Sequence, residues 1–207
     1  MMASAFLERE ADGSQPIRNG AFVAIVGPSG AGKDTLIAHA RSALADEPQV
    51  EFVRRVITRP CDGQTEVHDT LADDAFVAAQ AKGAFALAWE AHGLRYGLPA
   101  SVDRAIDNGQ VAVANVSRGA LPALRRRYAN VAVVEVTADP EILAARLAGR
   151  GRESHGEILS RLARTATCDT TGPAVALDNS GAKEIAGDRL VAIIRKAMAF
   201  ADMSGAV

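Results

Sequence analysis

A glycine-rich segment that ends in a lysine is the part of the chain whose residue types and spacing point most directly to chemistry. It reads Gly27-Pro28-Ser29-Gly30-Ala31-Gly32-Lys33-Asp34-Thr35, with the spacing of a Walker A phosphate-binding loop. Glycine lets the backbone turn tightly, so that successive N–H groups point inward around an anion. A following helix N-terminus and the Lys33 ammonium add positive charge at the same place. The segment therefore predicts binding of a nucleoside triphosphate, namely ATP with Mg²⁺.

The residue after the lysine departs from the general pattern. A Ser or Thr usually stands there and binds Mg²⁺ through its hydroxyl, whereas this chain has Asp34, followed by Thr35. A carboxylate is also a hard oxygen ligand that suits Mg²⁺. The sequence therefore predicts a metal ligand at Asp34 or Thr35, and the choice between the two stays open.

A second group of cations lies in an arginine-rich stretch with glycines at its centre, and it includes Arg146, Arg150, Arg152 and Arg161. Two helices joined by a basic loop can close over a phosphate donor as a lid, which we place at about 146–161. Guanidinium groups then meet the charge that develops during phosphoryl transfer. We expect guanidinium groups of this stretch to carry this stabilisation together with Lys33, and Arg146 to contact ATP.

The elements that must position these residues alternate between strand and helix. Short apolar runs predict strands over 22–26, 52–57, 85–89, 111–116, 131–136 and 174–177. Helical spacing and end signals predict helices over 34–45, 72–82, 99–108, 140–148, 157–167 and 183–200. This alternation predicts an α/β fold of the P-loop NTPase type, with a parallel sheet covered by helices on both faces.

The length and pattern indicate one domain, over 20–203, preceded by a flexible leader over 1–19. Residues 52–97 are less regular, and we expect them to form a small lobe that binds the acceptor. In parallel sheets, ligands bind at the carboxyl ends of the strands. The phosphate loop follows such a strand end, so we place the site there.

Composition narrows the classes of partner. Hydrophobic residues make up 48% of the 207 residues, charged residues 23%, and the formal net charge is −2. These values predict a globular chain with no nucleic-acid-coating surface. No apolar run approaches the about 18–20 residues that span a bilayer. The two cysteines, Cys61 and Cys168, match no metal or redox spacing, so we expect free thiols and a cytoplasmic location. The sequence does not distinguish a monomer from a homodimer.

Three further motifs fall in an order that resembles the guanylate kinase family. They are Thr58-Arg59-Pro60, the run from His92 to Gly97, and the run from Gly149 to Glu153 that continues to Arg161-Leu162. The resemblance extends over most of 21–196. It implies that Arg59 and Tyr96 hold the phosphate of the acceptor, and that Arg150 and Arg161 hold the phosphates of the donor. It also implies that Asp178 and Asn179 lie beside the adenine.

The chain departs from this family where guanine is recognised. Guanylate kinases use a glutamate before the Tyr-Gly pair and a Ser or Thr after it, but this chain has Leu87 and Leu98 at the matching positions. Leucine offers no hydrogen bond to a base edge. A further phosphate-holding arginine is replaced by Asp62. We therefore expect an acceptor that keeps a phosphate and lacks a purine base.

The same combination is similar to the ribose 1,5-bisphosphate phosphokinase branch of these kinases. The similarity lies in the Gly-Lys-Asp-Thr end of the loop, the run from Trp89 to Gly97, and Ser117-Arg118. It implies transfer of phosphate from ATP to ribose 1,5-bisphosphate, giving 5-phospho-α-D-ribose 1-diphosphate in phosphonate breakdown. Candidate ligands for the acceptor phosphates are Arg54, Arg55, Arg59, Arg95 and Arg118. Adjacent strand residues face opposite sides, so without a bulge only one of Arg54 and Arg55 can face the site. The resemblance implies Arg55, because a phosphate-holding residue of the family falls at that position.

Two alternatives remain at this point. One is a nucleoside monophosphate kinase with an altered base preference, and the other is a non-catalytic guanylate-kinase-like binding module. Retention of Lys33, Arg150 and Arg161 speaks against the binding module.

Several other residues have weaker signals. Asn115, at a strand end, is a candidate for assisting Mg²⁺ or the sugar, or else a cap or turn residue. His92 is a candidate for the acceptor pocket. We expect Trp89 and Phe85 to belong to the core.

Overall fold

Five parallel strands form the main sheet of the computed structural model, which describes residues 15–60, 68–148 and 172–204. The strand order is β2-β7-β1-β8-β9, and every pair of neighbours is parallel. The strands are β1 (Ala21–Val26), β2 (Val50–Phe52), β7 (Val111–Asn115), β8 (Val131–Thr137) and β9 (Val175–Asp178). The central strand β1 is buried along its whole length, as its continuous apolar sequence requires. The predicted parallel sheet is therefore confirmed.

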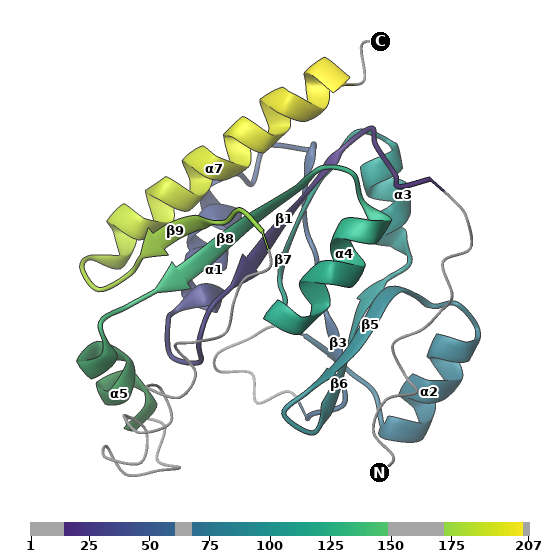
Figure 1. Cartoon of the computed structure of the whole chain (residues 1–207), viewed down its shortest axis with the longest axis horizontal. Coiled ribbons are helices and arrows are strands. Elements are labelled where there is room, and N and C mark those ends of the chain that lie inside the picture. The colour runs from purple at the N-terminus through teal and green to yellow at the C-terminus, as the bar shows by residue number, and fades with distance from the viewer. Residues whose placement is uncertain (1–14, 61–67, 149–171, 205–207) are drawn as a thin grey trace.

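Helices cover both faces of this sheet (Figure 1). Ala21, Val23 and Ile25 pack on one side, in a core shared with α1 (Lys33–Ala43) and α7 (Lys183–Ser204). Phe22, Ala24 and Val26 pack on the other side, with α3 (Ser101–Asp107) and α4 (Leu121–Arg127). The helix α5 (Pro140–Ala148) follows β8 and begins where the sequence predicts. Both cores depend on the alternation of side chains along buried strands.

The irregular middle segment forms a second sheet of four strands. Its order is β4-β3-β6-β5, with β3 (Val56–Ile57), β4 (Asp69–Thr70), β5 (Phe85–Ala91) and β6 (Leu94–Pro99). The helix α2 (Asp73–Ala81) packs beside it, where Phe76 stacks on Phe85 with 4.5 Å between ring centroids. His92 and Gly93 make the β5–β6 turn with φ of 53° and 72°, the left-handed region that a two-residue hairpin turn uses.

The predicted strand over 52–57 is wrong as one element. Residues 50–52 pair with β7 in the main sheet, whereas 56–57 pair with β4 and β6 in the second sheet. The last bond to the main sheet runs from the amide of Val53 to the carbonyl of Val113, at 2.9 Å. Apolar residues continue through the segment because both sheets need them, so the local pattern does not mark the break.

Other differences from the predicted elements are smaller. The strand β6 was not predicted, and Pro99 ends it, so the predicted helix over 99–108 begins two residues later, at Ser101. The helix α4 and the short 3₁₀ turn η1 (Arg118–Ala120) before it were also missed. The predicted helix over 157–167 lies outside the described residues. No helix in the part of the chain that the structure describes is long and apolar enough to cross a membrane.

The end of the predicted flexible leader is bound to the domain. Ile17 bridges to Tyr128, and its amide donates to the carbonyl of Arg127 at 3.0 Å. The Asn19 side chain donates to the carbonyl of Asp107 at 2.8 Å. For residues 17–19 the expectation of a free leader is therefore wrong, because their backbone and side chains have partners near the amino ends of β1 and β8.

Tyr128 links the segment around Ile17 to α3. Its ring stacks on Phe22 with 5.5 Å between centroids, and its hydroxyl donates to Asp103 at 2.8 Å. Asp103 also accepts from the Arg127 guanidinium. Burial and the adjacent Asp103 carboxylate raise the pKa of the Tyr128 hydroxyl. The hydroxyl therefore stays protonated and acts as a donor.

We predict that Tyr128→Phe lowers the free energy of unfolding by about 1.5–3 kcal/mol, the range for a hydrogen bond to a charged acceptor. The ring stays in place, so packing against Phe22 is kept. Urea denaturation with Ser42→Ala, a change at an exposed helix position, as the control measures the effect. Equal stability of Tyr128→Phe and wild type would contradict a role for the hydroxyl.

Candidate active site

The segment over 27–35 forms a tight loop between β1 and α1. Gly27, Gly30 and Gly32 have φ of 141°, 84° and 86°, a region that L side chains rarely adopt. A Cβ on Gly27 would lie 2.2 Å from the carbonyl oxygen of Val136 in β8. The loop therefore needs glycine for its conformation and for its close approach to the neighbouring strand.

The Lys33 side chain folds back over this loop. Its Nζ donates to the carbonyl oxygens of Gly27 at 2.9 Å and of Pro28 at 2.8 Å. Lys33 is also the first residue of α1, so the helix N-terminus and the ammonium group lie at the same point. This is the cationic arrangement that attracts a polyphosphate.

Asn179 holds the other side of the loop. It is buried, and its Nδ2 donates to the carbonyl of Ala31 at 2.7 Å while its backbone N–H donates to Thr137 at 2.8 Å. A Cβ on Gly32 would lie 2.4 Å from this Nδ2. Asn179 therefore supports the phosphate loop directly, a contact that the sequence did not predict.

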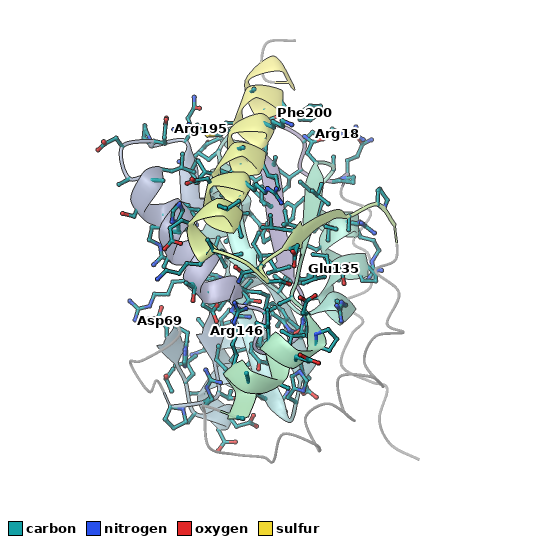
Figure 2. The ribbon with its side chains drawn as sticks, turned by 90° about the vertical axis from the view of Figure 1, so that its left-hand side faces the viewer. Arg18, Asp69, Glu135, Arg146, Arg195 and Phe200 are labelled. Carbon is teal, nitrogen blue, oxygen red and sulfur yellow. The ribbon has the colours of Figure 1, made fainter. Side chains whose placement is uncertain are left out.

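Arg146 reaches the same place from α5. One Nη donates to the carbonyl of Asn179 at 3.0 Å, and the other is buried with no hydrogen-bond partner among the described residues. The neighbouring Asp178 carboxylate accepts hydrogen bonds from Ser180, which lower its pKa. Arg146 and Glu135 lie toward the end of the molecule opposite Arg18 and Phe200 (Figure 2).

Asp34 is held by a residue from the next strand. The side-chain amide of Asn115, at the end of β7, donates to Asp34 Oδ1 at 2.9 Å. Thr35 is exposed on α1. One residue along a helix turns the side chain by about 100°, so Asp34 and Thr35 project in different directions. Within the described residues no group of three or more His, Cys, Asp or Glu residues surrounds a common point.

An aromatic and cationic cluster lies on one face of the second sheet. Trp89 and Tyr96 are directly paired across β5 and β6, and their rings stack with centroids 5.5 Å apart. The Arg55 guanidinium lies 5.5 Å from the Tyr96 ring centroid, and Arg55 is only 7% exposed. Arg54 is exposed and pairs with Asp69 at 2.8 Å. The two adjacent arginines therefore have different surroundings, although both lie between β2 and β3 and neither belongs to a strand.

The two leucines at the guanine-reading positions are also paired across these strands. Leu87 lies opposite Leu98 in the register of β5 and β6. Leu98 is fully buried in the core, and Leu87 is half-buried against it. Leu98 has no exposed surface, so its side chain does not line an acceptor recess directly, although its place at a guanine-reading position led us to expect that it would. It can support such a recess only from the core side.

Arg59 lies just after β3. Its carbonyl accepts from His68 Nε2 at 3.1 Å and from Thr70 Oγ1 at 3.0 Å, so its backbone is attached to β4. Arg118 lies at the carboxyl end of β7 and donates to Glu135 of β8 at 2.6 Å. Sequence reasoning missed Glu135, although one carboxylate within the apolar strand over 131–137 was a usable signal.

Arg95 is not part of this cluster. It alternates with Tyr96 on β6, and its guanidinium pairs with Asp73 at 2.7 Å and with Glu90 at 2.6 Å. The hydrogen bond to Asp73 raises the pKa of Arg95. The structure therefore does not bring Arg95 together with Tyr96 and Arg55, because β6 turns it to the other face. Arg150, Arg161 and Asp62 lie outside the described residues.

Comparisons with known proteins agree with this arrangement. No known family profile matches the chain. A guanylate kinase from Anaplasma phagocytophilum has the same fold, with a TM-score of 0.62 and 17% identity over 89% of this chain and 88% of that one. The predicted fold class is therefore confirmed.

Two relatives are much closer in sequence. A ribose 1,5-bisphosphate phosphokinase from a Chelativorans species is 48% identical over 98% of both chains. One from Brucella melitensis is 53% identical over 78% of this chain and 85% of that protein. Identity at this level over nearly the whole length confirms the predicted resemblance, and the chain belongs to the ribose 1,5-bisphosphate phosphokinase family.

Proposed function

We propose that the chain transfers the γ-phosphoryl group of ATP to the 1-phosphate of ribose 1,5-bisphosphate. The products are ADP and 5-phospho-α-D-ribose 1-diphosphate, as a step of phosphonate breakdown in the cytoplasm. The main support for this acceptor is that Leu87 pairs with Leu98 at the base-reading positions, beside a cluster in which Arg55 lies over Tyr96. Cations are present for an acceptor phosphate, while the base-reading positions are apolar.

The same observation argues against guanylate kinase activity. A purine edge that faced leucines would lose its hydrogen-bond partners, at about 1–3 kcal/mol for each buried group left unpaired. A sugar bisphosphate has no base and needs anion ligands at both ends. Arg55, Tyr96, Arg59 and Arg118 are our candidates for these ligands.

On the donor side, the loop over 27–35 and Lys33 bind the phosphates. Arg146 supports the same role through its partly buried guanidinium next to Asn179. We keep Arg150 and Arg161 as lid residues that meet the developing charge, and Asp178-Asn179 as the segment beside the adenine. The phosphate of the acceptor is already a nucleophile at neutral pH, so the reaction needs little or no general base. The protein supplies alignment and positive charge to two polyanions.

Asp34 is the residue that we assign to Mg²⁺, because Asn115 holds its carboxylate at the end of β7 while Thr35 projects elsewhere. The ion supplies charge neutralisation to the triphosphate when bound. Asn115 orients Asp34 by donating to one oxygen, which leaves the other oxygen available.

An acceptor screen tests the proposed activity. Purified protein with MgATP should release ADP with ribose 1,5-bisphosphate, and the product should be 5-phospho-α-D-ribose 1-diphosphate by mass spectrometry. GMP and other nucleoside monophosphates should give little turnover. Efficient use of GMP with none of the sugar bisphosphate would favour the nucleoside monophosphate kinase alternative.

Lys33→Ala should lower kcat by at least about 100-fold, because it removes a charge that stabilises the transferring phosphoryl group. Steady-state kinetics with ribose 1,5-bisphosphate measures this, and a melting curve checks that the variant is folded. A rate close to wild type would instead support a non-catalytic binding module.

Asp34→Asn should raise the Mg²⁺ concentration needed for half-maximal rate by about tenfold or more, since an amide oxygen carries no charge to attract the ion. Thr35→Val is the matched variant and should change this concentration by less than about twofold. Rates measured across a Mg²⁺ titration at fixed ATP give both values. The reverse order of effects would assign the metal to Thr35.

A further inference from the structure

Trp89 is the only tryptophan of the chain, and it has two specific contacts besides burial. It is 5% exposed, and its ring is nearly parallel to that of Tyr96, with 9° between the planes. Its indole N–H donates to Ser117 Oγ at 2.9 Å. A buried indole N–H generally finds an acceptor, and here the acceptor is a side chain far along the sequence, Ser117.

The indole hydrogen bond joins the two sheets. Trp89 belongs to β5 of the second sheet, whereas Ser117 follows the carboxyl end of β7 in the main sheet. The next residue, Arg118, pairs with Glu135 on β8, and Glu135 lies beside Val26 at the start of the phosphate loop. Contacts therefore run from Tyr96 through Trp89 and Ser117 to the strands that carry the loop.

At their other end, these contacts begin at the cluster that we assign to the acceptor. Tyr96 stacks on Trp89, and Arg55 lies over the Tyr96 ring. In-line transfer depends on the distance and angle between the two phosphates, and small errors of placement lower the rate strongly. The second sheet must therefore be held at a defined position relative to the phosphate loop.

We propose that Trp89 is a positioning residue for the acceptor site. Its ring sets the orientation of Tyr96, and its hydrogen bond to Ser117 sets the position of the Tyr96–Arg55 pair relative to the phosphate loop. The identity of the acceptor in this inference rests on the proposed function. The role of Trp89 does not, because it follows from contacts that any acceptor phosphate at Tyr96 would share.

Kinetics of Trp89→Phe and Ser117→Ala test the inference. Phenylalanine keeps an aromatic ring and loses the N–H donor, while Ser117→Ala removes only the acceptor oxygen. Each change should raise the KM for ribose 1,5-bisphosphate about tenfold, the effect of one buried hydrogen bond. The KM for ATP should stay within about twofold, whereas kcat should fall by about tenfold, because a displaced acceptor phosphate is misaligned for in-line transfer. The double variant should be no worse than either single variant, because both remove the same bond.

Two serine variants serve as controls. Ser117→Thr retains the hydroxyl and should keep the wild-type KM, whereas Ser42→Ala changes an exposed helix residue and should have no effect. Equal increases in the KM for ATP and for the acceptor would overturn the inference, as would an unchanged KM in Ser117→Ala. If the wild type uses a nucleoside monophosphate instead, the proposed function fails. The KM for that acceptor is then compared between wild type, Trp89→Phe and Ser117→Ala, and this comparison tests the role of Trp89 independently.

Fluorescence gives an independent measurement, since all tryptophan emission of the chain comes from Trp89. Ribose 1,5-bisphosphate should change the emission of wild-type protein in a saturable manner. The apparent Kd should rise in Ser117→Ala by about the same factor as the KM. Saturable binding with an unchanged Kd in Ser117→Ala would show that the bond does not position the acceptor site.

Discussion

The close approach of the phosphate loop to its neighbours is the constraint on which the rest of the site depends. Gly27 lies against the backbone of β8 and Gly32 lies against the Asn179 side chain, and neither position has room for a Cβ. Only this path brings the backbone N–H groups and the N-terminus of α1 to one point. Asn179, Arg146 and Asp34 are then placed by their contacts with this loop or with the strands around it.

Charge is distributed differently at the site and away from it. Away from it, Arg54, Arg95 and Arg127 pair with carboxylates, and such bonds compensate the positive charge. At the site, Lys33 donates to carbonyl oxygens, Arg146 donates to the carbonyl of Asn179, and Arg55 lies over an aromatic ring. These contacts orient the three cations through neutral groups, whereas Arg118, another candidate ligand of the acceptor, pairs with the Glu135 carboxylate. A bound phosphate would therefore compete with Glu135 for the Arg118 guanidinium.

Much of the fold was predictable because buried parallel strands and phosphate loops have strong local patterns. The strands β1, β7 and β8 and the helices α1, α5 and α7 lie where apolar runs and end signals place them. Strand alternation was our reason for placing Arg54 and Arg55 on different sides, but both residues lie between β2 and β3, outside the strands. Alternation was not applied to Arg95, because β6 was not recognised as a strand. With β6 known, its alternation with Tyr96 would have placed Arg95 on the other face.

By itself, the sequence determined the phosphate loop, the alternation of strands and helices, and the family, since each of these depends on neighbouring residues or on ordered motifs. Tertiary structure alone decided which distant residues meet. The bonds Asn115–Asp34, Trp89–Ser117 and Asn179–Ala31 join residues 81, 28 and 148 positions apart. No local pattern encodes such pairs, because they depend on the order of strands in the sheet and on how the second sheet packs against the first. The division of the segment over 52–57 between two sheets has the same origin, since burial on either sheet selects the same apolar residues.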